Sequence, residues 1–166
     1  MKKLKLLLTI LIVFTFLSCS SEDNPNPNLD PLIGIWKPIK EVETYVDNST
    51  TEFDFSSCSQ MSRFIFNEDG TLDIVEFAND EISGSCEKRT EPVLTFGSWE
   101  KISNEKYRLI TTYTYTANQQ SYTDDDIPDV FKFENNYNTV KIGYADDEII
   151  NGKQLQNYYT VFIRVE

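Results

Sequence analysis

Residues 107–116 read YRLITTYTYT, and the fold prediction starts from this pattern. The odd-numbered positions carry three tyrosines, a leucine and a threonine, while the even-numbered positions carry Arg108, Ile110 and three threonines. Aromatic and β-branched residues at this density favour an extended chain over a helix. A period of two places the odd-numbered side chains on one face. The segment therefore predicts a β-strand that packs one face against a core.

Other segments of the chain have the same character and are separated by turn signals. Glu68-Asp69-Gly70-Thr71 is typical of a hairpin turn, because Asp-Gly readily supplies positive φ angles. Three polar stretches, at 79–91, 117–127 and 145–156, are predicted as loops. The expected strands span about 34–46, 62–67, 71–77, 93–102, 107–116, 129–134, 139–144 and 158–165.

Eight strands joined mostly by short connections predict an all-β, up-and-down antiparallel meander. Such a ribbon closes into an eight-stranded barrel in which the first strand pairs with the last, so that no edge is left open. A sandwich of two sheets has the same strand count and stays open as the alternative. We assign residues 32–166 to this single domain.

Residues 1–18, MKKLKLLLTILIVFTFLS, have a basic start followed by an apolar run. The run is too short to span a bilayer of roughly 30 Å and is typical of a signal peptide. Leu17-Ser18-Cys19 resembles a bacterial lipobox, from which Phe16 departs by its size. The resemblance implies that Cys19 is lipidated, by diacylglycerol on its thiol and an acyl chain such as palmitate on its amine. An ordinary secretory signal followed by a chance cysteine is the alternative.

Residues 19–31 are polar and rich in Asn and Pro, so they are predicted to be a flexible tether. Glu22 and Asp23 resemble the acidic export signal of Bacteroidetes surface lipoproteins, although a solvated linker explains them equally well. We expect a lipid anchor in the outer membrane, and leave open whether the domain faces the periplasm or the cell surface.

Gly34-Ile35-Trp36 resembles the Gly-x-Trp motif that opens the first strand of lipocalins and of lipocalin-like bacterial lipoproteins of Bacteroidetes type. The resemblance covers about residues 32–166 and implies an eight-stranded barrel whose closed end is plugged by Trp36. It further implies that a basic residue near the C-terminus, here Arg164, stacks on that ring. Gly97-Ser98-Trp99 repeats the motif. Plain core packing explains both tryptophans without any ligand.

Apart from Cys19, the chain has two cysteines, Cys58 and Cys86. They flank the hairpin predicted around Asp69-Gly70, so its open ends bring them near each other. An even pair in an exported chain predicts a structural disulfide.

The chain has 27 acidic and 15 basic residues. Lys2, Lys3 and Lys5 belong to the leader, so the mature part has 12 basic residues and a formal charge of −15. Such a surface argues against nucleic-acid binding. The sequence has no histidine, which removes Ser-His-Asp catalysis and the usual zinc ligands.

We therefore expect no enzymatic activity, no cofactor and no metal, with a hydrolase built on two carboxylates as the alternative. Acidic runs at 124–126 and 146–148 invite a calcium interpretation, but they lack EF-hand spacing and are assigned to solvated loops.

The leading functional hypothesis is a monomeric binding protein that holds a small hydrophobic ligand in the barrel mouth. The alternative is a non-catalytic interaction or structural protein of the cell envelope, in which the same side chains fill the barrel. The candidate ligand-facing residues are Phe64, Phe66, Tyr113, Tyr115, Val140, Ile142 and Tyr144.

Overall fold

The computed structural model describes residues 29–165, and this part of the chain is all-β with antiparallel sheets and no α-helix. The leader, Cys19 and the tether up to residue 28 lie outside the described residues. The elements are β1 (Gly34–Tyr45), β2 (Thr50–Asp54), the single-turn helix η2 (Ser59–Met61), β3 (Arg63–Phe66), β4 (Leu72–Val75), β5 (Phe77–Asn79), β6 (Cys86–Lys88), β7 (Val93–Ser103), β8 (Lys106–Tyr115), β9 (Gln120–Asp126), β10 (Val130–Glu134), β11 (Thr139–Ala145), β12 (Ile149–Ile150) and β13 (Lys153–Arg164).

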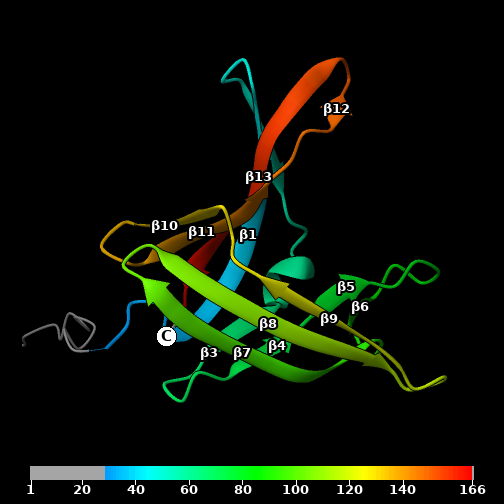
Figure 1. Ribbon diagram of the computed structural model, residues 1–166. Coiled ribbons are helices and arrows are strands. Elements are labelled where there is room, and N and C mark those ends of the chain that lie inside the picture. Colours follow the sequence, from blue (N-terminus) through cyan, green and yellow to red (C-terminus); the bar gives the residue numbers. More distant parts are fainter. Residues whose placement is uncertain (1–28, 166) are drawn as a thin grey trace, which may run out of the picture.

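The strands form one large sheet, one smaller sheet and a hairpin (Figure 1). The large sheet has the order β10-β11-β13-β1-β3-β4, with β2 beside β1 and β12 beside β13. The smaller sheet is β7-β8-β9, and β5 pairs with β6. The expected pairing of first and last strands is present, because β1 and β13 pair from Trp36↔Arg164 to Tyr45↔Leu155. The hairpin around Gly70 is also present.

The predicted closed barrel is not found. Among the described residues, β4 and β7 are joined only by the isolated bridge Thr71↔Ser98, and no ladder joins β9 to β10. Gly97 explains the contact, since a Cβ there would lie 2.0 Å from the Leu72 carbonyl oxygen. A register shift between Leu94 and Phe96 interrupts the regular course of β7 beside that contact, as β-bulges do. The backbones of the two sheets are therefore bridged at this one place in the described residues, and the strands diverge from it.

The predicted loop at 117–127 was wrong in its main part, because β9 occupies Gln120–Asp126. β9 is exposed along its whole length and has no apolar alternation. Its outward side chains are matched to those of β8, with hydroxyl pairs such as Thr112–Thr123 at 2.8 Å and the ion pair Arg108–Asp125 at 2.6 Å. Cross-strand pairs of this kind stabilise a sheet without burial.

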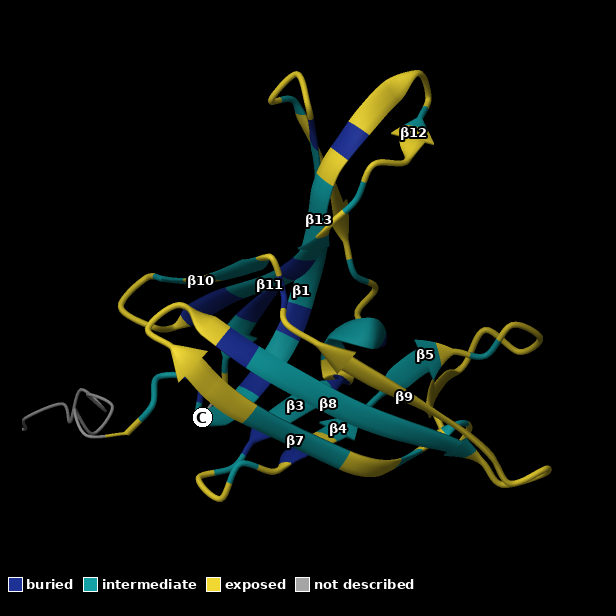
Figure 2. Ribbon diagram, viewed as in Figure 1, coloured by how far each residue is buried: buried dark blue, intermediate teal, exposed yellow. Residues whose placement is uncertain are grey.

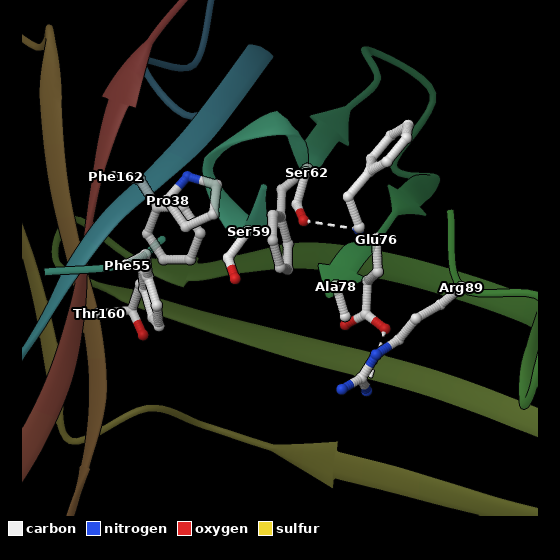
Figure 3. Close-up of a pocket in the computed structure, with 11 residues that line it drawn as sticks. Pro38, Phe55, Ser59, Ser62, Glu76, Ala78, Arg89, Thr160 and Phe162 are labelled. Carbon is white, nitrogen blue, oxygen red and sulfur yellow. Dashed lines mark hydrogen bonds and ion pairs between the residues drawn. The ribbon is translucent and has the colours of Figure 1, made fainter. Parts of the chain in front are cut away.

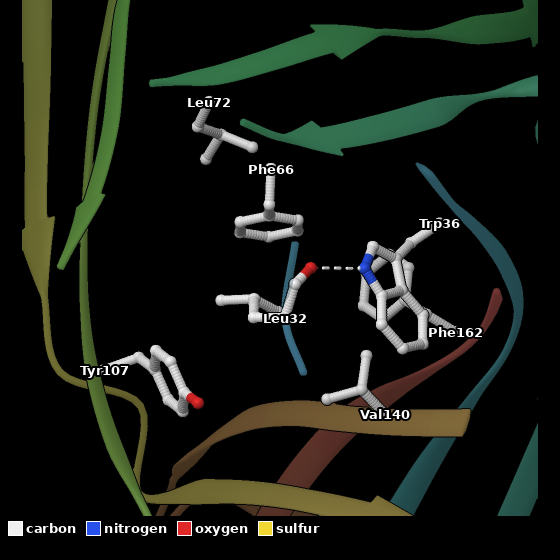
Figure 4. Packing of buried hydrophobic residues seen from close by; sticks show 7 residues of the cluster. All are labelled: Leu32, Trp36, Phe66, Leu72, Tyr107, Val140 and Phe162. Atoms are coloured by element: carbon white, nitrogen blue, oxygen red, sulfur yellow. Dashed lines mark hydrogen bonds between the residues drawn. The ribbon is translucent and has the colours of Figure 1, made fainter. Parts of the chain in front are cut away.

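The core lies where the two sheets face each other (Figures 2 and 4). Its buried members are Leu32, Trp36, Phe66, Leu72, Tyr107, Val140 and Phe162. The Trp36 Nε1 donates to the Leu32 carbonyl over 2.8 Å, and the Tyr107 hydroxyl donates to Asp30 over 2.8 Å. Because each buried polar tip has a partner, these large aromatic side chains fill the centre without an unsatisfied group.

The predicted disulfide is confirmed. Cys58 and Cys86 are bonded, with 5.4 Å between their Cα atoms. The bond fastens η2 and the entry to β3 onto the β5–β6 hairpin. This hairpin and η2 are the elements that wall the concave face of the large sheet.

Candidate functional site

The end of the molecule where β1 begins and β13 ends is sealed by Trp36 and Arg164. β1 begins at Gly34 with φ 138°, which L-residues rarely adopt, and Trp36 follows fully buried. The Arg164 guanidinium lies over the Trp36 ring, 4.4 Å from its centroid, as the resemblance implied. Arg164 also donates to the carbonyls of Ile33, over 2.6 Å, and of Pro31. Burial lowers the pKa of Arg164.

The second Gly-x-Trp motif lies at the only backbone bridge described between the two sheets. Gly97 allows β7 to approach Leu72, and the Trp99 Nε1 donates to the Asn67 carbonyl over 3.0 Å. The Trp99 ring meets Phe66 edge-on, with centroids 6.1 Å apart. Both tryptophans therefore pack structurally, and neither lines the cavity described next.

A cavity of about 240 Å³ lies in the concave face, between the β1–β13 pair on one side and η2 with β5 on the other (Figure 3). Its wall is formed largely by apolar side chains, and Phe64 and Phe162 meet there edge to face with centroids 4.9 Å apart. Ser62 is buried, and its Oγ is already engaged because it accepts a hydrogen bond from the Phe77 backbone N–H. The lining residues are Pro38, Phe55, Ser59, Ser62, Phe64, Glu76, Phe77, Ala78, Arg89, Thr160 and Phe162.

Two charged residues stand at the rim of this cavity. The Arg89 guanidinium and the Glu76 carboxylate are 3.9 Å apart, and the Arg89 backbone N–H donates to the Glu76 carbonyl over 2.8 Å. Both also line a groove of about 620 Å³ that opens where β4 and β7 diverge, together with Ile74 and Tyr113. The rim therefore connects the apolar cavity to the opening between the two sheets.

Tyrosines lie on both sheets, and one of them, Tyr113, lines this groove. Tyr113 and Tyr122 stack with centroids 5.4 Å apart, and Tyr144 lies 6.2 Å from Tyr158 on the other sheet. Burial, with the charge of Glu76 as the next cause, raises the pKa of Tyr113 to about 12. Burial also raises the pKa of Tyr144 to about 12, and the negative charge of Asp126 is the second cause of this shift. Both rings are therefore neutral at physiological pH and present aromatic faces and hydroxyl donors.

The structure separates the predicted ligand-facing residues into groups. Phe64 lines the cavity and Tyr113 lines the adjoining groove. Phe66 and Val140 pack in the solid core, and Ile142 packs against it. Tyr115 and Tyr144 lie outside both linings; Tyr115 is 42% exposed.

Sequence reasoning missed Pro38, Glu76 and Arg89. Alternation along β1 places Pro38 on the same face as Trp36, so that residue had a usable signal. No sequence signal indicated Glu76 and Arg89. Their contact depends on the β5–β6 hairpin, most of which lies in a stretch interpreted as a loop.

Within residues 29–165, no group of three or more Cys, Asp or Glu side chains is arranged to hold a metal ion. No helix in this part of the chain is both long and apolar enough to cross a membrane. No protein-family model matches the chain, and none of the curated proteins matches its sequence. The cavity and its rim are therefore the features of the molecule that bear on its function.

Proposed function

We propose that this chain is an extracytoplasmic lipoprotein, held in the outer membrane through lipidated Cys19, whose domain binds a small apolar ligand without catalysing a reaction. The observation that carries the proposal is the cavity between Phe64, Phe162 and Phe55, with a polar rim at one side. An apolar concave wall with a few charged groups at its edge is the usual form of a small-molecule site. The short signal-like leader and the lipobox-like residues support the anchor.

The lipocalin resemblance is part of this proposal. The eight predicted strands correspond to β1, β3, β4, β7, β8, β10, β11 and β13. Within this series, β1-β3-β4, β7-β8 and β10-β11-β13 pair in the meander order. We interpret the two sheets as an eight-stranded barrel that is open on two sides, between β4 and β7 and between β9 and β10. The Trp36–Arg164 stack at the sealed end supports this view.

The cavity limits the ligand. Its volume of about 240 Å³ lies below the ~300–1,000 Å³ of typical drug-sized sites. A short alkyl chain or a single ring fits this space, whereas a retinoid or a haem does not. Since each buried methylene contributes about 0.8 kcal/mol and association carries its own entropic cost, we expect affinities in the micromolar to millimolar range.

The test is calorimetric titration of the chain carrying Cys19→Ala with octanol, a retinoid and haem. We expect saturable binding of octanol alone. Ala78 lines the cavity, so Ala78→Trp fills it and abolishes binding, whereas Ala145→Trp, at an exposed position, leaves binding unchanged. Failure of octanol to bind, or binding that survives Ala78→Trp, would contradict the proposal.

A structural or interaction role in the envelope is the second candidate, and two observations favour it. The seven core residues pack solidly, and β9 is exposed along all of its residues with one edge unpaired in the described chain. An exposed strand edge can take up a strand from a partner. The octanol titration separates the two candidates, because a purely structural domain gives no heat of binding.

A further inference from the structure

The inner wall of the β8–β9 hairpin carries carboxylates beside tyrosines. The register Tyr113↔Tyr122 and Thr111↔Asp124 places Tyr122 and Asp124 on the face of the sheet that bears Tyr113. The neighbouring Asp125 points to the opposite face, where Arg108 holds both of its oxygens at 2.6 Å. Asp124 is therefore aimed at the opening, and Asp125 is aimed away from it.

Asp126 shares this orientation, because it lies opposite Leu109, which packs against the core. Its charge and that of Asp124 both act on Tyr144 of the other sheet and contribute to the raised pKa of that residue. Asp124 and Glu76 act in the same way on Tyr113. The acids on the inner wall of β9 therefore face tyrosines across the gap between the two sheets, and Tyr113 and Glu76 both line the groove that adjoins the cavity.

The charge of this gap is negative. Two basic residues, Lys88 and Arg89, line the adjoining groove beside two acids, Asp73 and Glu76, and the Arg89 guanidinium lies 3.9 Å from the Glu76 carboxylate. Asp124 and Asp126 of β9 therefore give this side of the gap its excess of negative charge. In the described part of the chain, no lysine or arginine forms an ion pair with Asp124 or Asp126. A cation at this position would be attracted by both carboxylates, neither of which is paired with a basic residue. An anion would be repelled by them.

The tyrosines give this gap a second property that favours a cation. A ring face attracts an ammonium group through its quadrupole, and cages of aromatic side chains with nearby acids recognise alkylated amines. Tyr122 is 43% exposed, stacks on Tyr113 and lies 6.3 Å from Tyr115, so these rings form an aromatic surface that is partly accessible to a ligand. The rings remain neutral at physiological pH and add no anionic charge of their own.

We propose that the mouth of the cavity selects ligands that carry an alkylated ammonium head group on a short apolar chain. The chain occupies the space between Phe64 and Phe162, and the head group lies among Tyr113, Tyr122 and Asp124. This inference rests on the proposed function, because it adds a head-group preference to the apolar site.

The experiment is calorimetric titration of the Cys19→Ala chain with three octyl compounds: octyltrimethylammonium, octanol and octanoate. We expect the ammonium compound to bind at least about tenfold more tightly than octanol, and octanoate to bind more weakly than octanol. Raising the salt concentration to about 0.5 M should shrink the preference and leave octanol unaffected, since screening acts on exposed charges.

Variants locate the effect. Asp124→Asn should weaken octyltrimethylammonium binding about fivefold and leave octanol binding unchanged. Asp125→Asn removes the same charge from the opposite face of the same strand. It should change neither the octyltrimethylammonium affinity nor the octanol affinity. Tyr122→Leu should lose part of the preference and Tyr122→Phe should keep it, because phenylalanine retains the ring face. Thermal melting of each variant checks that it is folded.

The outcomes distinguish this inference from the proposed function. If octanol binds but octanoate binds as tightly as the ammonium compound, or more tightly through Arg89, the head-group inference is wrong and the apolar site stands. Equal effects of Asp124→Asn and Asp125→Asn would also overturn it. If none of the three compounds binds, both proposals fail together.

Discussion

The Arg164 guanidinium lies 4.4 Å from the centre of the Trp36 ring, directly across the ladder that joins the first strand to the last. Residues separated by most of the chain thus form one contact at the sealed end of the molecule. The same side chain donates to two carbonyls of the segment that precedes β1, at Ile33 and Pro31. Arg164 therefore ties the entry segment, the first strand and the last strand together.

We expect Arg164→Ala to lower the free energy of unfolding by about 2–4 kcal/mol, because it removes the cation–π contact and leaves part-buried carbonyls without a donor. Arg164→Lys should restore less than half of the lost unfolding free energy, because an ammonium group cannot stack flat on the ring and also reach both carbonyls. Urea unfolding followed by tryptophan fluorescence measures the change. Lys132→Ala, at a side chain 69% exposed, is the control and should cost at most about 0.5 kcal/mol. Equal losses at both positions would contradict the assignment.

The Cys58–Cys86 bond closes a loop of 28 residues. In the chain-entropy model such a loop contributes about 3–4 kcal/mol, so reduction or a Cys58→Ser/Cys86→Ser double variant should lower stability by about that amount. The bond also holds η2 against the β5–β6 hairpin, and both elements line the cavity. We therefore expect octanol affinity to fall in the folded double variant. Unchanged affinity would show that the cavity does not depend on the bond.

Much of the fold could be predicted because it is encoded locally. The alternation at 107–116 predicted β8, and Asp69-Gly70 predicted the β3–β4 hairpin. The positions of Cys58 and Cys86 on either side of that hairpin predicted the disulfide. β9 could not be found this way. Its residues are polar on both faces, and they form a strand because β8 offers matching hydroxyl and charged partners rather than because they bury apolar surface.

The open barrel and the site depend on contacts that alternation does not encode. The sheets separate because β7 touches β4 only near Gly97, and the bulge near Leu94 is invisible in the sequence. Glu76 and Arg89 meet at the cavity rim through a three-residue strand pair within a polar stretch. By contrast, Phe66 and Val140 were correctly placed on inward faces, but those faces lie where the core is solid.

Gly97 should tolerate no side chain. A Cβ there would lie 2.0 Å from the Leu72 carbonyl oxygen, so Gly97→Ala must push β4 and β7 apart at their only described bridge. We expect a loss of about 2–4 kcal/mol in unfolding free energy, as for overpacking against a backbone atom. Gly84→Ala is the comparison: the added methyl meets nothing within 4 Å, and only its φ of +69° is strained, so about 1 kcal/mol is expected. A smaller loss at Gly97 than at Gly84 would contradict the close approach.

The raised pKa values of Tyr113 and Tyr144, each about 12, make stability depend on alkaline pH. In the unfolded chain a tyrosine titrates near 10, so between about pH 10 and 12 the unfolded state releases protons that the folded state keeps. The stabilisation is complete below pH 10 and is lost as pH rises through 12, which we expect to cost about 1–2 kcal/mol per tyrosine. Urea unfolding from pH 8 to 11.5 measures the loss in the wild type and in a Tyr113→Phe/Tyr144→Phe double variant, with tyrosinate absorbance followed in parallel. Because phenylalanine does not titrate, the double variant should show a shallower decline, and any alkaline loss due to lysines remains in both. Identical slopes would mean that these two hydroxyls are not held neutral by the surrounding walls.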